Sequence, residues 1–226
     1  MRTLSLSGLL LAATLPALAQ TTPATPIPRY YVGLNAYNSF YQPMFRPAVV
    51  RGSVPVQVVA GYQLRPRLAV QVGLAGSSSS HDYSYTGWGY NSGSPSFSYQ
   101  SQAGTTTWRA LSASVLGRYT LTRQLHHRFQ ADLLFGFTLE TGSARNQGTR
   151  TDSVGGSFVA VPYDDRSHGQ LLLLTAGSSL RYRVLPGLDL NFDLTLNRTL
   201  NGPGTWQLPA GLSTATALGL RFRFGH

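Results

Sequence analysis

The stretch Leu188-Asp189-Leu190-Asn191-Phe192-Asp193-Leu194-Thr195-Leu196-Asn197 alternates strictly between apolar and polar side chains. Successive side chains of a β-strand point to opposite faces, so this alternation predicts a strand with one apolar face and one polar face. Similar alternation recurs in about eight segments of roughly 10 residues, the length at which a tilted strand crosses the hydrocarbon core of a bilayer. The sequence therefore predicts a transmembrane β-barrel.

The connections between these segments alternate in length. Strands are expected at 30–38, 54–64, 67–77, 108–121, 128–140, 170–184, 188–197 and 212–224. Short turns are expected at 64–66, 122–127 and 185–187, and long loops at 39–53, 78–107, 141–169 and 198–211. Outer-membrane barrels have short periplasmic turns and longer extracellular loops. We therefore predict an all-β fold, an eight-stranded antiparallel up-and-down transmembrane β-barrel with both termini in the periplasm.

The N-terminal segment and the overall composition agree with export to the bacterial outer membrane. Residues 1–19 combine a basic Arg2, an apolar run and a small-residue cleavage site, which predicts a signal peptide. Residues 20–28 are rich in Pro and Thr and predict a periplasmic lead-in, and residues 29–226 form the barrel. The chain has no cysteine, which excludes disulfides and thiolate metal sites. Its net charge of +10 comes from scattered arginines, so we expect no nucleic-acid partner.

Aromatic residues provide a check that is independent of the strand assignment. Seven rings in the outward frame fall at the short-turn end of the predicted strands: Tyr30, Tyr62, Tyr119, Phe129, Tyr182, Phe222 and Phe224. Amphipathic rings prefer the membrane–water interface, so these residues predict an aromatic girdle at one edge of the barrel. Rings that filled the core of a soluble barrel would instead be scattered along the strands.

The last strand carries a more specific pattern. Leu218, Leu220, Phe222 and Phe224 alternate toward an aromatic end. With this strand the chain resembles the eight-stranded outer-membrane β-barrels of the OmpA-transmembrane and OmpX-like type. The resemblance implies that Leu220, Phe222 and Phe224 act as an assembly signal for the barrel-assembly machinery, although Gly225-His226 replaces the usual terminal Phe. It also implies adhesion, membrane integrity, small-solute transport or lipid A modification as roles, and the fold does not choose among them.

The inward frame collects charges of both signs. The expected lumen charge network consists of Arg118, Asp132, Arg181, Arg183, Asp189, Asp193, Arg221 and Arg223. The tight turn should set Arg183 opposite Asp189, and Arg118 is expected opposite Gln130 and diagonal to Asp132. An eight-stranded barrel is only wide enough for side chains to fill, so mixed-sign pairs favour a plug. The alternative is a narrow channel or hydrophobic-solute conduit.

Catalytic candidates are few. A hydrolase triad of Ser, His and a carboxylate could be built from four residues beside the sixth strand: Asp164, Asp165, Ser167 and His168. Ser167 and His168 are adjacent in sequence, so their side chains should point to opposite faces. No His or carboxylate spacing suggests a metal site. We expect no enzymatic activity, no cofactor and no metal, and the lipid A-modifying enzyme is the third hypothesis.

The long loops suggest recognition. Six aromatic side chains in 78–107 are candidates for a binding surface: Tyr83, Tyr85, Trp88, Tyr90, Phe97 and Tyr99. The alternative is that this loop only continues the two adjacent strands above the membrane, with Tyr83, Tyr85 and Tyr99 packing on each other. Outer arginines could meet lipopolysaccharide phosphates, namely Arg46, Arg51, Arg109, Arg145, Arg150 and Arg166. Because the catalytic candidates are weak and the long loops suggest recognition, our leading hypothesis is a monomeric barrel with a structural or surface-interaction role. Its expected partners are outer-membrane lipids, lipopolysaccharide, the assembly machinery and an extracellular glycan or protein ligand.

Overall fold

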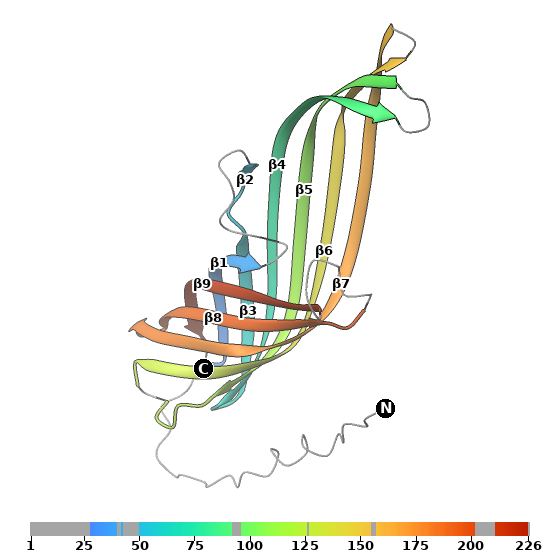
Figure 1. Cartoon of the computed structure of the whole chain (residues 1–226). Helices are drawn as coiled ribbons and strands as arrows, with labels where there is room; N and C mark the ends of the chain where they lie inside the picture. Colours follow the sequence, from blue (N-terminus) through green and yellow to red (C-terminus); the bar gives the residue numbers. More distant parts are fainter. Residues whose placement is uncertain are drawn as a thin grey trace, which may run out of the picture.

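A computed structural model of the chain describes residues 28–39, 42, 50–91, 96–125, 127–154, 157–201 and 211–225 (Figure 1). The expected signal peptide and most of the lead-in lie outside these ranges. The strands are β1 (Tyr30–Ser39), β2 (Val50–Gly52), β3 (Val56–Arg65), β4 (Leu68–Asn91), β5 (Ser96–Thr120), β6 (Phe129–Val154), β7 (Ser157–Leu185), β8 (Leu188–Thr199) and β9 (Leu212–Phe224). Among the described residues, there is no helix of the length and hydrophobicity needed to cross a membrane.

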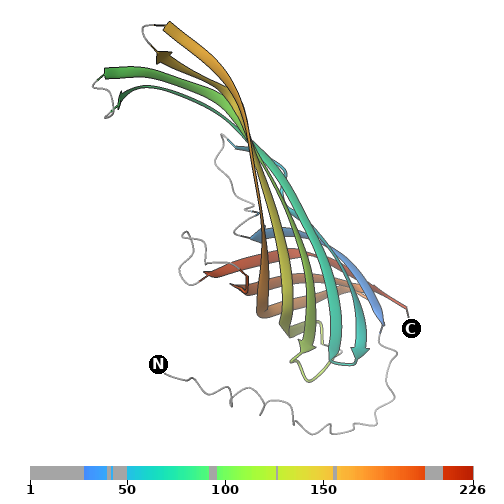
Figure 2. The same ribbon diagram turned by 90° about the vertical axis from the view of Figure 1, so that its right-hand side faces the viewer.

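The sheet closes on itself into an eight-membered ring. Each long strand pairs antiparallel with its sequence neighbour, and β1 pairs with β9 from Tyr30↔Phe224 to Ser39↔Ala215. The short strand β2 pairs with β4 just beyond the part of β4 that pairs with β3, so β2 and β3 occupy the same position in the ring. Figure 2 shows these strands wrapping around the lower part of the molecule. The predicted eight-stranded antiparallel up-and-down barrel is confirmed, and closure leaves no open sheet edge in this part.

The two faces of the strands follow the sequence alternation. Along β8 every second residue is buried and the others are exposed, so that Asn191 is 0% exposed whereas Leu194 is 42% exposed. The apolar side chains thus point outward and the polar ones fill the interior. This is the reverse of a soluble protein and is the pattern that a bilayer requires, because hydrocarbon surrounds the outside.

The tight turns explain why the barrel reverses at one end with so few residues. In the β7–β8 turn, Pro186 stands at the second position and Gly187 at the third with φ of 87°. A type II turn needs a positive φ at the third position, which glycine adopts without steric cost, and proline favours the second. The start of β1 and the end of β9 meet at the same end, where the Arg29 backbone N–H donates to the Gly225 carbonyl at 3.1 Å.

The predicted girdle of aromatic rings surrounds this end. The Tyr30 ring lies 5.1 Å from that of Tyr62 and 5.9 Å from that of Phe224, and the Phe222 and Phe224 rings are 6.1 Å apart. Leu220, Phe222 and Phe224 all point outward from β9 and are exposed. Their position at the final strand agrees with the assembly-signal hypothesis, which stays a prediction.

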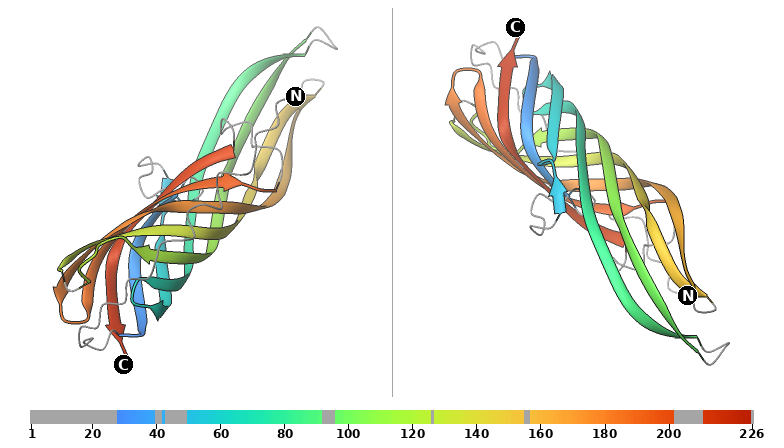
Figure 3. Two further views of the ribbon diagram at one scale, coloured as in Figure 1. Left: turned by 90° about the horizontal axis from the view of Figure 1, so that it is seen from below. Right: turned by 90° about the horizontal axis from the view of Figure 1, so that it is seen from above.

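Four strands run much further than the sequence analysis expected. The segments 78–107 and 141–169, expected as loops, are mostly ladder: β4 pairs with β5 up to Asn91↔Ser96, and β6 with β7 up to Val154↔Ser157. In contrast, the β7–β8 pairing stops at Leu173↔Thr199. The result is a four-stranded sheet of β4 to β7 beyond the barrel, here called the extension. It curves away to one side of the barrel, as the views from below and above show (Figure 3).

Candidate functional site

The centre of the lumen network is Asp132 on β6, which is 1% exposed. Its carboxylate accepts hydrogen bonds from Arg118 Nη1 at 2.9 Å and from Arg181 Nε and Nη2 at 2.7 Å each. Thr120 Oγ1 donates a further bond at 2.8 Å. One carboxylate therefore compensates two buried guanidinium groups, and the charge-assisted bonds offset the cost of removing the three charges from water.

Arg118 carries this network across the lumen. Besides Asp132, its guanidinium donates to Asp193 Oδ2 at 2.9 Å, Gln71 Oε1 at 3.1 Å and Ser179 Oγ at 2.6 Å. These partners belong to β8, β4 and β7, whereas Arg118 itself is on β5 and Asp132 on β6. A single side chain thus connects five of the eight strands through the middle of the barrel.

The remaining predicted charges lie nearer the short turns. Asp189 accepts from Arg223 Nη2 at 3.0 Å and lies 3.9 Å from Arg181 Nη1. Arg183 is opposite Asp189 in register, as predicted, and also donates to the Leu125 carbonyl at 3.3 Å. Arg221 is 1% exposed, with its guanidinium carbon 4.3 Å from the centre of the Tyr31 ring. This cation–π contact places a negative ring face against a desolvated cation.

One detail of the predicted register is wrong. Arg118 lies opposite Leu134 and not opposite Gln130, although it is diagonal to Asp132 as expected. The reason is that the β5–β6 connection has internal structure: the Leu121 N–H donates to the Ala131 carbonyl, and the Ala131 N–H donates to Thr122 Oγ1. Gln130 instead pairs with Arg181 across β6 and β7.

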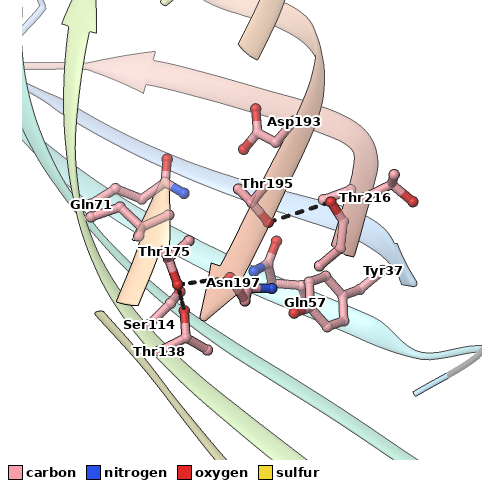
Figure 4. A pocket seen from close by; sticks show the side chains of 13 residues that line it. Tyr37, Gln57, Gln71, Ser114, Thr138, Thr175, Asp193, Thr195, Asn197 and Thr216 are labelled. Carbon is pink, nitrogen blue, oxygen red and sulfur yellow. Dashed lines mark hydrogen bonds between the residues drawn. The ribbon is translucent and has the colours of Figure 1, made fainter. Parts of the chain in front are cut away.

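Above the ion pairs the lumen is lined mostly by uncharged polar side chains, with the buried carboxyl group of Glu140 on β6 beyond them. Thr175 Oγ1 donates to Asn197 Oδ1 at 2.8 Å and lies 2.8 Å from Thr138 Oγ1 (Figure 4). These groups border a cavity of about 30 Å³ that also reaches Tyr37 and Gln57. A water molecule needs about 10 to 15 Å³ of such space, so the cavity has room for very few waters. At this level, side chains of the described residues therefore fill most of the lumen.

On the inner face of the extension, Tyr83 of β4 meets Tyr163 of β7. Their hydroxyl groups are hydrogen-bonded, and Tyr83 also donates to Asn146 Oδ1 at 2.7 Å. The two side chains meet over Gly104 and Gly148. A Cβ atom added at Gly104 would lie 2.5 Å from the Tyr163 hydroxyl, and one at Gly148 would lie 2.6 Å from it. The two glycines therefore leave room for the contact that joins β4 and β7, the outer strands of the extension.

The six predicted recognition aromatics do not share one surface. By strand alternation Tyr83 and Tyr85 face inward, whereas Trp88 and Tyr99 lie on the outer face and are directly opposite each other. The side chains of Tyr90 and Phe97 lie outside the described residues. Phe158 on β7, which sequence reasoning missed, has its ring 5.4 Å from that of Tyr99, and the Tyr99 ring is 5.5 Å from that of Trp88. The row Trp88–Tyr99–Phe158 is here called the aromatic row.

The hydrolase candidates are separated by the same alternation. Ser167 pairs with Ala144 and His168 with Ser143, so the two side chains leave opposite faces of the sheet, as the sequence indicated. Asp164 is engaged by Arg145 Nε and Nη2 at 2.8 Å each and by Arg166 Nη2 at 3.2 Å. The hydrogen bonds from Arg145 and Arg166 hold the pKa of the Asp164 carboxyl well below its usual range. It is therefore an ionised partner for arginine and not a proton donor near neutral pH.

Comparisons with known proteins concern the fold. No protein-family model and no curated protein matches the chain. Similar solved structures include Ail, the attachment invasion locus protein of Yersinia pestis (10% identity, TM-score 0.42, 88% of this chain and 100% of Ail). Neisserial surface protein A is also similar (16% identity, TM-score 0.39, 86% and 97%). A third is the outer membrane protein OprG of Pseudomonas aeruginosa (9% identity, TM-score 0.38, 88% and 94%). With its closed ring of eight strands, polar inside and apolar outside, the chain has the fold of the eight-stranded outer-membrane β-barrels.

Proposed function

We propose that this protein is a closed, non-enzymatic outer-membrane barrel whose role is to present the extension for interaction outside the cell. The single observation that carries the proposal is the continuation of β4 to β7 as an ordered ladder well beyond the last β7–β8 pair, Leu173↔Thr199. Hydrogen-bonded strands fix the positions of their side chains, so the extension can hold a surface that a loop of the same length would not define.

The aromatic row is the part of this surface with the clearest recognition chemistry. Trp88 is 70% exposed and Phe158 is 66% exposed, which is unusual for rings that lie far from the apolar band. The neighbouring outer-face positions are small or hydroxylated, for example Ser101 and Thr86. Exposed ring faces beside hydroxyl groups can stack against a sugar ring and bind its hydroxyls, so a glycan is the ligand we favour and a protein is the alternative.

The first expected result tests recognition by the aromatic row. Replacing Trp88 and Phe158 together by Ala should abolish binding of whole cells to a panel of immobilised neutral glycans, because both stacking surfaces are lost. Tyr85→Ala is the matched control, since Tyr85 is 62% exposed and lies on the opposite face of the same strand. Loss of binding in the control but not in the double variant would contradict the assignment of the outer face. Binding only to protein probes would favour the alternative ligand.

A second expected result tests the orientation. The chain contains no cysteine, so each single-cysteine variant carries one reactive thiol. Ser84→Cys on the extension should react with a membrane-impermeant maleimide in intact cells, and Arg123→Cys in the β5–β6 turn should react only after permeabilisation. Both positions are exposed, so accessibility within the fold does not bias the comparison. The opposite labelling pattern would mean that the extension faces the periplasm and the short turns face outside, which would contradict the proposed orientation.

A third expected result concerns conduction. Purified protein in planar bilayers should show no stable single-channel current, because Arg118 and its partners on four other strands cross the lumen. Steady, ion-selective currents from the unmodified protein would contradict the closed barrel and favour the channel hypothesis. A heat-unfolded sample measured in the same bilayers serves as the control for leakage.

A further inference from the structure

Three arginines and a histidine gather on the outer face of the extension where it leaves the barrel. Arg145 on β6 lies directly opposite Arg166 on β7, and Ser143 lies between Arg109 on β5 and His168 on β7 in the adjacent row. All belong to the outward frame that carries the apolar side chains further down the same strands. This group, Arg109, Arg145, Arg166 and His168, is here called the basic cluster.

The basic cluster begins where the apolar band ends. The apolar band ends on β5 at the row Leu111↔Thr141↔Gln170, in which Leu111 is 53% exposed. Arg109 is two residues beyond Leu111, or about 7 Å along the strand, and the Arg145 row is about 7 Å further. Headgroups occupy roughly 5 to 8 Å on each side of the hydrocarbon core. The cluster therefore starts at the depth of the headgroup phosphates.

The local charge balance leaves this surface positive. Two guanidinium groups directly opposite each other on a sheet repel, and here Asp164 holds both Arg145 and Arg166 in place. Arg109 is exposed, and its side chain forms no hydrogen bond or ion pair within the part of the chain that the structure describes. Among the described residues, the other acidic group on this face is Asp82 on β4, which accepts from Thr105 Oγ1 at 2.7 Å. Asp152 and Asp165 belong to the inner face.

We propose that the basic cluster binds the phosphate groups of lipid A in the outer leaflet. A guanidinium group donates two parallel hydrogen bonds to phosphate oxygens, and its positive charge is not lost at any physiological pH. Asp164 orients Arg145 and Arg166 side by side, with 49% and 67% of their side chains still exposed for a second partner. Bound lipid would fasten the base of the extension to the membrane surface. The proposal rests on the orientation proposed above, with the extension outside.

The test compares lipid A bound to purified protein by native mass spectrometry. The triple variant Arg109→Gln, Arg145→Gln, Arg166→Gln should bind bisphosphorylated lipid A at least about tenfold more weakly, since it loses the charge-assisted hydrogen bonds to the phosphates. Arg150→Gln is the matched control: Arg150 is also an exposed β6 arginine in an ion pair, with Asp152, but on the inner face. The control should bind like the unmodified protein.

Two further probes decide which chemistry is recognised. Dephosphorylated lipid A should bind the unmodified protein as weakly as bisphosphorylated lipid A binds the triple variant. Inorganic phosphate at the same concentration should not compete, because it lacks the acyl chains that contact Leu111 and the apolar band. Equal binding of both lipid A forms would overturn the phosphate site, and full competition by free phosphate would overturn the lipid source. The maleimide experiment reports orientation separately, so failure of either proposal can be told apart.

Discussion

Replacing Asp132 by Ala should destabilise the barrel by about 3 to 5 kcal/mol, the largest loss we expect from a single lumen substitution. Asp132 accepts three hydrogen bonds from Arg118 and Arg181 and a fourth from Thr120. Its removal leaves two desolvated cations near each other without the carboxylate that they share. The free energy of unfolding can be measured by urea titration in lipid vesicles, followed by tryptophan fluorescence.

Two controls separate this effect from simple loss of an aspartate. Asp152→Ala on the same strand breaks an exposed pair with Arg150 and should cost no more than about 1 kcal/mol. Combining Asp132→Leu with Arg118→Met and Arg181→Leu removes the three charges together and should be less destabilising than Asp132→Ala alone. A triple variant at least as unstable as Asp132→Ala would mean that hydrogen bonds to Thr120, Gln71 and Ser179 contribute more than charge balance.

The lumen shows what strand alternation can and cannot predict. Alternation alone assigned Arg118, Asp132, Arg181 and Asp193 to the interior, because a period of two fixes the face of each residue once the frame is known. It did not predict that Asp132 is shared by two arginines. That contact depends on the β5–β6 register, which is set by backbone and side-chain bonds of the intervening turn, such as the one from Ala131 to Thr122.

The extension was expected only as an alternative for 78–107 and not at all for 141–169, and the physical reason is different. Segments 78–107 and 141–169 are rich in Ser, Thr, Gly and Tyr and lack an apolar face, so their alternation carries no hydrophobic signal. Their strands are held instead by long antiparallel ladders and by contacts across the sheet, such as that between Tyr83 and Tyr163. Such contacts join residues 80 positions apart, so they appear only when the strands have been paired.

The surface candidates illustrate both cases. Odd and even positions of a strand point to opposite faces, so Tyr85 and Trp88 must lie on opposite faces of β4. The sequence alone would have shown this if 78–107 had been taken as strand. Phe158 could not have been found in this way, because its contact with Tyr99 requires the registers of β5, β6 and β7 together. The basic cluster likewise depends on the alignment of Arg145 with Arg166 across two strands.

Leu194→Arg should destabilise the protein in a bilayer by about 2 to 4 kcal/mol, because Leu194 points outward near the middle of the apolar band and the guanidinium would meet hydrocarbon. Asn191→Ser is the control on the same strand: Asn191 is fully buried in the lumen and donates one bond to Asn35 Oδ1 at 3.3 Å, so its loss should cost about 1 kcal/mol. Both values follow from urea unfolding in vesicles of matched thickness. In a detergent micelle the cost of Leu194→Arg should shrink, since headgroups and water can reach a deforming micelle more easily than the bilayer core. An equal cost for the two substitutions in the bilayer would show that the outward face does not contact lipid, and the barrel would then have to be surrounded by something other than a membrane.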